Sequence, residues 1–262
     1  MPHTGAMRYL DDAPKIPAGA LSNPDADQLE RLAARGSVRV HLVLTPTVVP
    51  NAQSWNVVAE IKGREKPDEM VLIGGHLDSW DLGTGAIDDG AGVAIAAGAG
   101  RLIQKLPHHP KRTIRVILFG AEERGFSGEA YAKAHAETGK MVVASESDFG
   151  ARPVYSLRVP AGTDKSPFAV ALAGALMPLG VYSSAEPARF GGSDFDELQQ
   201  AGVPVISLRQ RGSDYFDLHH TADDTFDKVD PKELAQNVAV WADFAYLAAE
   251  MDIDLRQPAT AK

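Results

Sequence analysis

The segment MVLIGGHLDSWD, residues 70–81, decides how the chain folds, because it joins an apolar run to a polar turn. Residues 70–74 form a short continuous apolar run, which is typical of a strand buried on both faces of a parallel sheet. His76 and Asp78 follow this strand directly. In open α/β sheets, ligands bind beyond the carboxyl ends of the strands. The segment therefore predicts a buried strand with a functional site at its end.

Strands and helices alternate along the rest of the chain. The predicted strands cover residues 38–44, 57–62, 113–119, 141–145, 155–159 and 203–208. The predicted helices cover residues 25–35, 91–106, 126–135, 166–177 and 231–251. Asp230 and Glu233 predict a capping box at the start of the last helix. This alternation predicts the α/β class, with a central mixed, mostly parallel sheet and helices on both faces.

The composition is that of a globular protein, and it narrows the chemistry. The 262 residues include 35 Asp and Glu against 26 Lys and Arg, a formal net charge of −9. An acidic protein repels nucleic acid, and the sequence has no apolar run long enough for membrane insertion. The sequence also has no cysteine, which excludes a thiol nucleophile and a cysteine-based zinc site. Any metal must therefore be bound by His, Asp and Glu.

Acidic residues and histidines recur where the predicted strands end and in two nearby loops. They are Glu122 and Glu123, Glu146 and Asp148, Asp88 and Asp89, and His219 and His220. Each pair alone has an ordinary interpretation, since acids before a helix act as caps and acids in a loop are solvated. Gathered at one sheet edge, however, the carboxylates would repel one another. A pair of divalent cations would compensate that charge, and with histidines among the ligands zinc fits best.

The order of these motifs resembles a known family. His-Leu-Asp, Asp-Asp-Gly, Ala-Glu-Glu, Glu-Ser-Asp and His-Thr-(x)2-Asp-Thr are similar to the co-catalytic dizinc exopeptidases, which include bacterial leucyl aminopeptidases and carboxypeptidase Q. Residues 75–81 and 191–194 resemble the carboxypeptidase Q branch more closely. The resemblance covers roughly residues 54–251. It implies a three-layer sandwich that binds two zinc ions, for which cobalt or manganese could substitute.

The resemblance also implies a role for each motif residue. The metal ligands would be His76, Asp88, Glu123, Asp148 and His220, with Asp88 bridging both ions. Glu122 would be the general base, taking a proton from the zinc-bridged water and passing it to the leaving amine. Extended neighbours point in opposite directions, so we expect Glu123 to face metal and Glu122 to face substrate. Asp78 would accept a hydrogen bond from His76 and fix its tautomer.

Two departures concern the substrate. Many relatives have a tyrosine directly before the last zinc-binding histidine, and here His219 takes that position. We expect His219 to donate a hydrogen bond to the oxyanion. The alternative is that His219 only lines the pocket. Arg209 or Arg211 could bind a C-terminal carboxylate, although such arginines are often surface ion pairs. Ser193 and Asp194 form the other candidate substrate wall. The sequence leaves open which peptide terminus is recognised.

Three functions follow from these residues. The first is hydrolysis of dipeptides or short peptides at a chain terminus by a dizinc enzyme. The alternatives are a single-zinc, glutaminyl cyclase-like acyltransferase and a metal-free binding scaffold of the same fold. The expected partner is a peptide substrate, with no nucleic acid and no membrane insertion, and a homodimer is left open.

The chain divides near residue 40. We expect residues 1–40 to be the remnant of a preceding or inserted, protease-associated-like region, and residues 41–262 to be the catalytic domain. Residues 1–8 lack the features of a signal peptide. The family implies a periplasmic or extracellular parent protein, with a cytoplasmic one as the alternative.

Overall fold

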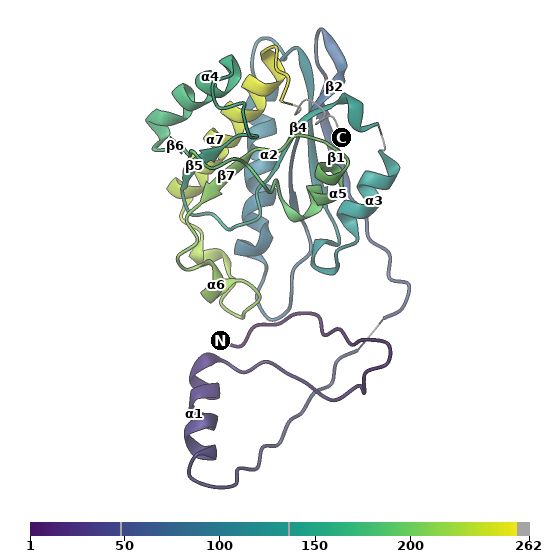
Figure 1. Ribbon diagram of the computed structural model, residues 1–262, viewed down its shortest axis with the longest axis vertical. Coiled ribbons are helices and arrows are strands. Elements are labelled where there is room, and N and C mark those ends of the chain that lie inside the picture. Colours follow the sequence, from purple (N-terminus) through teal and green to yellow (C-terminus); the bar gives the residue numbers. More distant parts are fainter. Residues whose placement is uncertain (48, 136, 256–262) are drawn as a thin grey trace.

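A central sheet of four strands organises the computed structural model, which describes residues 1–47, 49–135 and 137–255 (Figure 1). In spatial order its strands are β1 (Val57–Ile61), β3 (Arg112–Phe119), β2 (Lys66–His76) and β4 (Met141–Glu146). Strands β3, β2 and β4 run parallel, whereas β1 is antiparallel to β3. The sheet is therefore mixed and mostly parallel, which confirms the expected class.

Helices cover both faces of this sheet. Helices α2 (Ala91–Gln104), α4 (Pro167–Leu176) and α7 (Pro231–Glu250) lie on one face, and α3 (Ser127–Ala134) and α5 (Asp196–Gln200) lie on the other. Successive side chains of a strand point to opposite faces. In β3, Ile114 and Val116 accordingly pack with Trp241 of α7, whereas Ile117 and Phe119 pack against the other layer. Both faces of β3 are buried, although the sequence predicts burial on both faces only for residues 70–74.

A second, smaller sheet extends the central one. Its order is β6 (Tyr182–Ser183), β5 (Val154–Arg158) and β7 (Ser207–Gln210), with β5 parallel to β6 and antiparallel to β7. A parallel bridge between Ala144 and Val205 connects it to β4. The strand expected at 203–208 therefore bridges β4 at Val205 and becomes a regular strand only from Ser207.

Helix α7 begins as the sequence predicts, with one difference. The Asp230 carboxylate accepts hydrogen bonds from the backbone N–H groups of Lys232 at 2.7 Å and Glu233 at 3.3 Å. The Glu233 side chain pairs with Arg152 at 2.8 Å, so it serves a long-range ion pair. None of the helices in the described part of the chain is long and apolar enough to cross a membrane.

The first part of the chain forms an extension below the α/β body in Figure 1. It contains α1 (Asn23–Ala33), which Ser22 caps and which buries no residue. The strand expected at 38–44 is wrong, because these residues have no regular secondary structure and Val43 is 74% exposed. No described strand lies beside them, and an isolated strand is not stable in water. The extension returns to the body at Thr4, whose backbone N–H donates to the carbonyl oxygen of His220 at 2.7 Å.

Candidate metal centre

The acidic residues and histidines meet at the carboxyl edge of the central sheet. His76 is the last residue of β2, and Asp148 follows the end of β4. Asp88 lies in the turn Ala86–Gly90 before α2, and Glu123 lies in the turn Glu122–Arg124 after β3. The fold thus brings four separate segments to one edge, as the strand ends predict.

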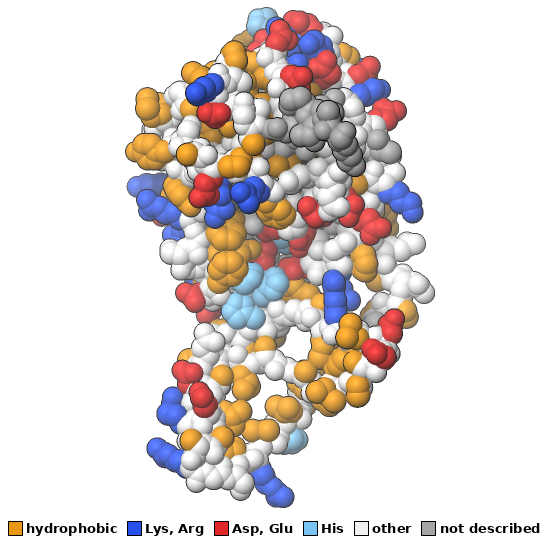
Figure 2. Space-filling view, viewed as in Figure 1, with side chains coloured by type: hydrophobic (Ala, Val, Ile, Leu, Met, Phe, Trp, Pro, Cys, Tyr) orange, Lys and Arg blue, Asp and Glu red, His pale blue; other side chains and the backbone are white. Residues whose placement is uncertain are grey.

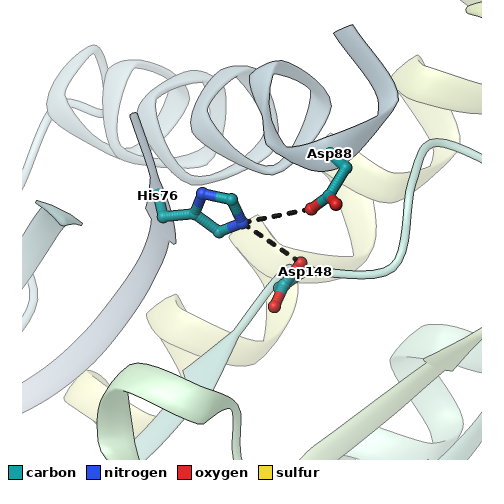
Figure 3. Close-up of side chains that lie close together, drawn as sticks. All are labelled: His76, Asp88 and Asp148. Carbon is teal, nitrogen blue, oxygen red and sulfur yellow. Dashed lines mark hydrogen bonds and ion pairs between the residues drawn. The ribbon is translucent and has the colours of Figure 1, made fainter. Parts of the chain in front are cut away.

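The first candidate metal group consists of His76, Asp88 and Asp148 (Figure 3). The His76 Nε2 atom lies 3.2 Å from Asp88 Oδ1 and 3.5 Å from Asp148 Oδ1. On the opposite side of the ring, Nδ1 lies 2.9 Å from the backbone carbonyl oxygen of Asp78 and donates to it. That hydrogen bond leaves Nε2 free to accept a cation, which is the usual arrangement of a liganding histidine.

The second candidate group consists of Asp88, Glu123 and His220. The His220 Nε2 atom lies 3.1 Å from Asp88 Oδ2 and 3.2 Å from Glu123 Oε2. Asp88 belongs to both groups, because its Oδ1 faces His76 and its Oδ2 faces His220. Its carboxylate is 4% exposed. All five expected ligands are therefore together, and Asp88 lies between the two halves.

The buried carboxylates at this centre favour the binding of cations. Burial opposes ionisation of His76, but hydrogen bonds to Asp148 and Asp88 raise its pKa far above the usual range. Hydrogen bonds to Asp88 and Glu123 raise the pKa of His220 to about 10. In the protein alone, two imidazolium protons thus face the buried carboxylates. Glu123 Oε1 is buried and accepts no hydrogen bond from any described residue. This N and O donor set fits zinc.

Asp78 acts differently from the expectation. Its carboxylate accepts hydrogen bonds from the backbone N–H groups of Glu122 at 3.0 Å and Glu123 at 3.2 Å. The expected bond from His76 goes to its backbone carbonyl instead, and the carboxylate is 3.7 Å from the ring. Asp78 therefore holds both the His76 ring and the turn that carries the two glutamates. That turn is a 3-10 helix, so the extended-chain argument for the two glutamates does not apply.

Glu122 and Glu123 nevertheless face different halves of the centre. Glu122 Oε2 lies 3.9 Å from His76 Nε2, beside the first group. Burial and the nearby Asp148 carboxylate raise the pKa of Glu122 to about 7. Glu123 turns towards His220 and also accepts a hydrogen bond from the Trp80 indole. A carboxyl group with a pKa near neutrality beside a metal group is suited to proton transfer.

His219 lies in an aromatic cluster next to the second group. Its ring stacks on Tyr215 at a centroid distance of 4.8 Å and lies 4.4 Å from the His220 ring. Burial and the neighbouring His220 lower the pKa of His219, which favours the neutral imidazole. Its Nδ1 atom is buried without a hydrogen-bond partner among the described residues. Tyr215, which the sequence analysis missed, is buried beside it.

The expected substrate residues separate into different places. Arg209 lines a cavity of about 270 Å³ that reaches Asp148, whereas Arg211 lines a different pocket beside Asp214 and Tyr215. Ser193 is exposed and lines a cavity of about 210 Å³ that reaches Glu122.

Asp194 lines the Glu122 cavity as well, but its side chain is 3% exposed. Its carboxylate accepts a hydrogen bond from the Ser127 hydroxyl at 2.7 Å. Its backbone N–H donates to Glu146 at 3.0 Å. The buried carboxylate is thus engaged within the protein, whereas the exposed Ser193 hydrogen-bonds to Glu122.

Two further aspartates hold the ligands in place, and the sequence analysis gave neither this role. Asp224 accepts hydrogen bonds from the backbone N–H groups of Ile87 at 2.6 Å and Asp88 at 3.1 Å. Asp89 accepts from the N–H groups of His76 and Gly92, both at 3.0 Å, so it caps α2 and also ties β2 to that helix. The capping interpretation of the Asp pair therefore holds for Asp89. The sequence feature that could have identified Asp224 is its position four residues after His220, in a loop rich in acidic residues.

Comparison with known proteins identifies the family. Residues 56–245 match peptidase family M28. The chain belongs to this family. Carboxypeptidase Q of Mus musculus is 40% identical over 258 residues, which cover 96% of this chain and 54% of that protein. The chain spans about half the length of the curated relatives that it matches. The resemblance seen in the motifs is thus confirmed.

Solved structures agree with the M28 assignment. The crystal structure of a peptidase M28 precursor from Shewanella amazonensis SB2B has a TM-score of 0.86 and 49% identity, and the match covers 100% of this chain and 60% of that chain. A zinc aminopeptidase from Bacillus subtilis has a TM-score of 0.58 at 19% identity, covering 75% of this chain and 50% of that chain. The second likeness shows a shared fold.

Proposed function

We propose that this chain carries the catalytic centre of a dizinc exopeptidase that hydrolyses dipeptides or short peptides. One observation carries the proposal: Asp88 directs one carboxylate oxygen to each of two histidine-containing groups. Such a shared carboxylate is what a pair of adjacent cations needs from its protein. The family match and the similarity to carboxypeptidase Q support peptide hydrolysis.

Each metal would have its own set of protein ligands. His76, Asp88 and Asp148 would bind one zinc, and Asp88, Glu123 and His220 would bind the other. When bound, a zinc pair lowers the pKa of water and polarises the peptide carbonyl. Cobalt or manganese could use the same donors. The protein contributes the fixed orientation of these side chains, through Asp78, Asp89 and Asp224.

Glu122 is the proposed general base. It lies beside the first group without belonging to either metal set. Burial raises its pKa to about 7, so it can accept a proton from the attacking water and release it to the leaving amine near neutral pH. The neutral His219 ring at the second group is the proposed donor to the oxyanion.

The cavity beside Asp148 supports recognition of a free carboxylate. Three arginines are among the residues that line it, Arg158, Arg189 and Arg209. Arg158 pairs with Glu186 at 2.5 Å, whereas among the described residues neither Arg189 nor Arg209 has a carboxylate partner. We therefore propose that the C-terminal carboxylate of a short substrate enters this cavity, and that Ser193 contacts the substrate from the separate cavity beside Glu122. Arg211 has no place in this proposal.

Replacement of Glu122 tests the proposed mechanism. Glu122→Gln keeps the size of the side chain and removes its ability to accept a proton, so we expect kcat on a dipeptide panel to fall by about 10²–10⁴-fold. Zinc content should stay unchanged, because Glu122 is not in the metal sets. Glu65→Gln, on an exposed side chain, is the matched control and should leave both unchanged. Retention of kcat in Glu122→Gln would contradict the assigned role.

We also propose that the division near residue 40 is real, with residues 1–40 outside the catalytic domain and residues 41–262 within it. Helix α1 has no buried residue, and the family match, which starts at residue 56, lies wholly in the second part; both support this division. An exported parent protein stays a prediction.

A further inference from the structure

The first residues of the chain lie against the metal centre. In Figure 1 the N-terminus is beside α6 (Tyr215–Leu218), which directly precedes the two histidines. Figure 2 shows histidine side chains gathered where the extension meets the body. The centroids of the His3 and His219 rings lie 5.2 Å apart, and those of the His219 and His220 rings lie 4.4 Å apart.

Thr4 makes a set of hydrogen bonds centred on His220. Its backbone N–H and its hydroxyl both donate to the His220 carbonyl oxygen, at 2.7 Å and 3.0 Å. The hydroxyl shares its single proton with the carbonyl oxygen of Asp81, to which it donates at 2.6 Å. In return, Nδ1 of the His220 ring donates to the Thr4 carbonyl oxygen at 3.1 Å. One residue of the extension thus engages both the backbone and the ring of His220.

His220 needs such support. Its φ of 58° lies in the left-handed region, which is uncommon for a residue with a side chain. The bonds from Thr4 fix the carbonyl of this residue, and the bond to Thr4 fixes the ring. With the proton held on Nδ1, the Nε2 atom points at Asp88 and Glu123.

The two histidines of the centre differ in what orients them. His76 donates to the carbonyl of Asp78, two residues away in the same loop. His220 donates to Thr4, which is 216 residues away in the sequence. The His76 ring is thus oriented from within the α/β body, and the His220 ring from the extension.

We propose that Thr4 is a positioning residue of the second metal group, so that the N-terminal extension completes that site. This inference rests on the proposed function, because it assigns Thr4 a role toward the metal that His220 would bind. It predicts that the two zinc ions differ in their dependence on Thr4. Partners that orient metal-binding histidines typically contribute about 10–100-fold to metal affinity.

Zinc titration of variants of this 262-residue chain tests this role. Thr4→Val removes the hydroxyl donor with little change in shape, Thr4→Pro removes the N–H donor as well, and Thr4→Ser keeps both. Competition with a chromophoric chelator would give the two zinc dissociation constants, with any affinity tag at the C-terminus. We expect one zinc to become about 10-fold weaker in Thr4→Val and up to about 100-fold weaker in Thr4→Pro, while the other stays unchanged. Thr4→Ser should bind as the unmodified chain does.

The control is Thr163→Val, which removes a hydroxyl whose hydrogen bond to Pro160 lies far from the centre in sequence. Cobalt substitution adds a spectroscopic readout, since the absorption of the weaker site alone should change in Thr4→Val. Two unchanged dissociation constants in both Thr4→Val and Thr4→Pro would overturn the role of Thr4. An unmodified chain that binds no zinc would overturn the proposed function, and this inference with it.

Discussion

At the scale of single residues, Arg209 and Arg211 have the same side chain but lie in different pockets. Both precede the histidine loop and both are candidates from the sequence. The structure places Arg209 in the cavity that reaches Asp148 and Arg211 in the pocket near Tyr215. Of the two, Arg209 is therefore the candidate for contact with a substrate beside the first metal group, and Arg211 is its matched control.

Arg209→Gln should weaken binding of substrates with a free C-terminal carboxylate. A hydrogen bond to a charged group contributes about 1.5–3 kcal/mol, so we expect KM for free dipeptides to rise by about 10–100-fold with kcat little changed. For the same dipeptides with an amidated C-terminus, the unmodified chain and Arg209→Gln should have the same KM and kcat. Steady-state kinetics on the two substrate series, with Arg211→Gln beside Arg209→Gln, measure this. An equal effect of the two substitutions, or none, would place carboxylate recognition elsewhere.

At the scale of the elements, the sequence predicts most of the body and the acidic residues and histidines that come together at the sheet edge. A continuous apolar run identifies β2, and a β-branched run identifies β3. His76, Glu123 and Asp148 lie at or just after the ends of parallel strands and therefore meet at one sheet edge, whereas Asp88 and His220 reach it from loops. The start of α7 is predictable for a local reason, since Asp230 caps its own helix.

What the sequence could not predict depends on contacts between distant segments. Residues 38–44 alternate like a strand, but pattern alone cannot supply a neighbouring strand to pair with. The Glu233 side chain accepts a hydrogen bond from Arg152, 81 residues away, instead of completing the capping box. The bond between His220 and Thr4 spans 216 residues, and no local pattern marks it. Orientation of the site by its surroundings is therefore the part that needs the structure.

At the scale of the whole molecule, the buried charges make stability depend on pH. Without metal, hydrogen bonds to Asp88 and Glu123 raise the pKa of His220 to about 10 from an ordinary value near 6.5. The stability that this histidine contributes is therefore fully present below about pH 6.5 and is lost as pH rises towards 10. Burial raises the pKa of Glu122 to about 7. Ionising this acid in the folded protein costs stability over the range between about pH 4.5 and 7, in the same direction.

We therefore expect the chelator-treated protein to melt at lower temperature as pH rises from 6 to 9. Zinc should reverse the trend, because metal binds the deprotonated ligands and its affinity rises with pH. Melting temperatures measured by calorimetry at each pH, with chelator and with zinc, provide the comparison. A metal-free melting temperature that rises across this range would contradict the assigned charge balance.

The most direct test of the dizinc centre is the amount of zinc bound per chain, measured by elemental mass spectrometry after exchange into metal-free buffer. We expect two zinc ions per chain, and at most one after Asp88→Asn, because that substitution removes the shared carboxylate. One zinc in the unmodified chain would contradict the account and favour the glutaminyl cyclase-like alternative. No zinc would favour a metal-free scaffold.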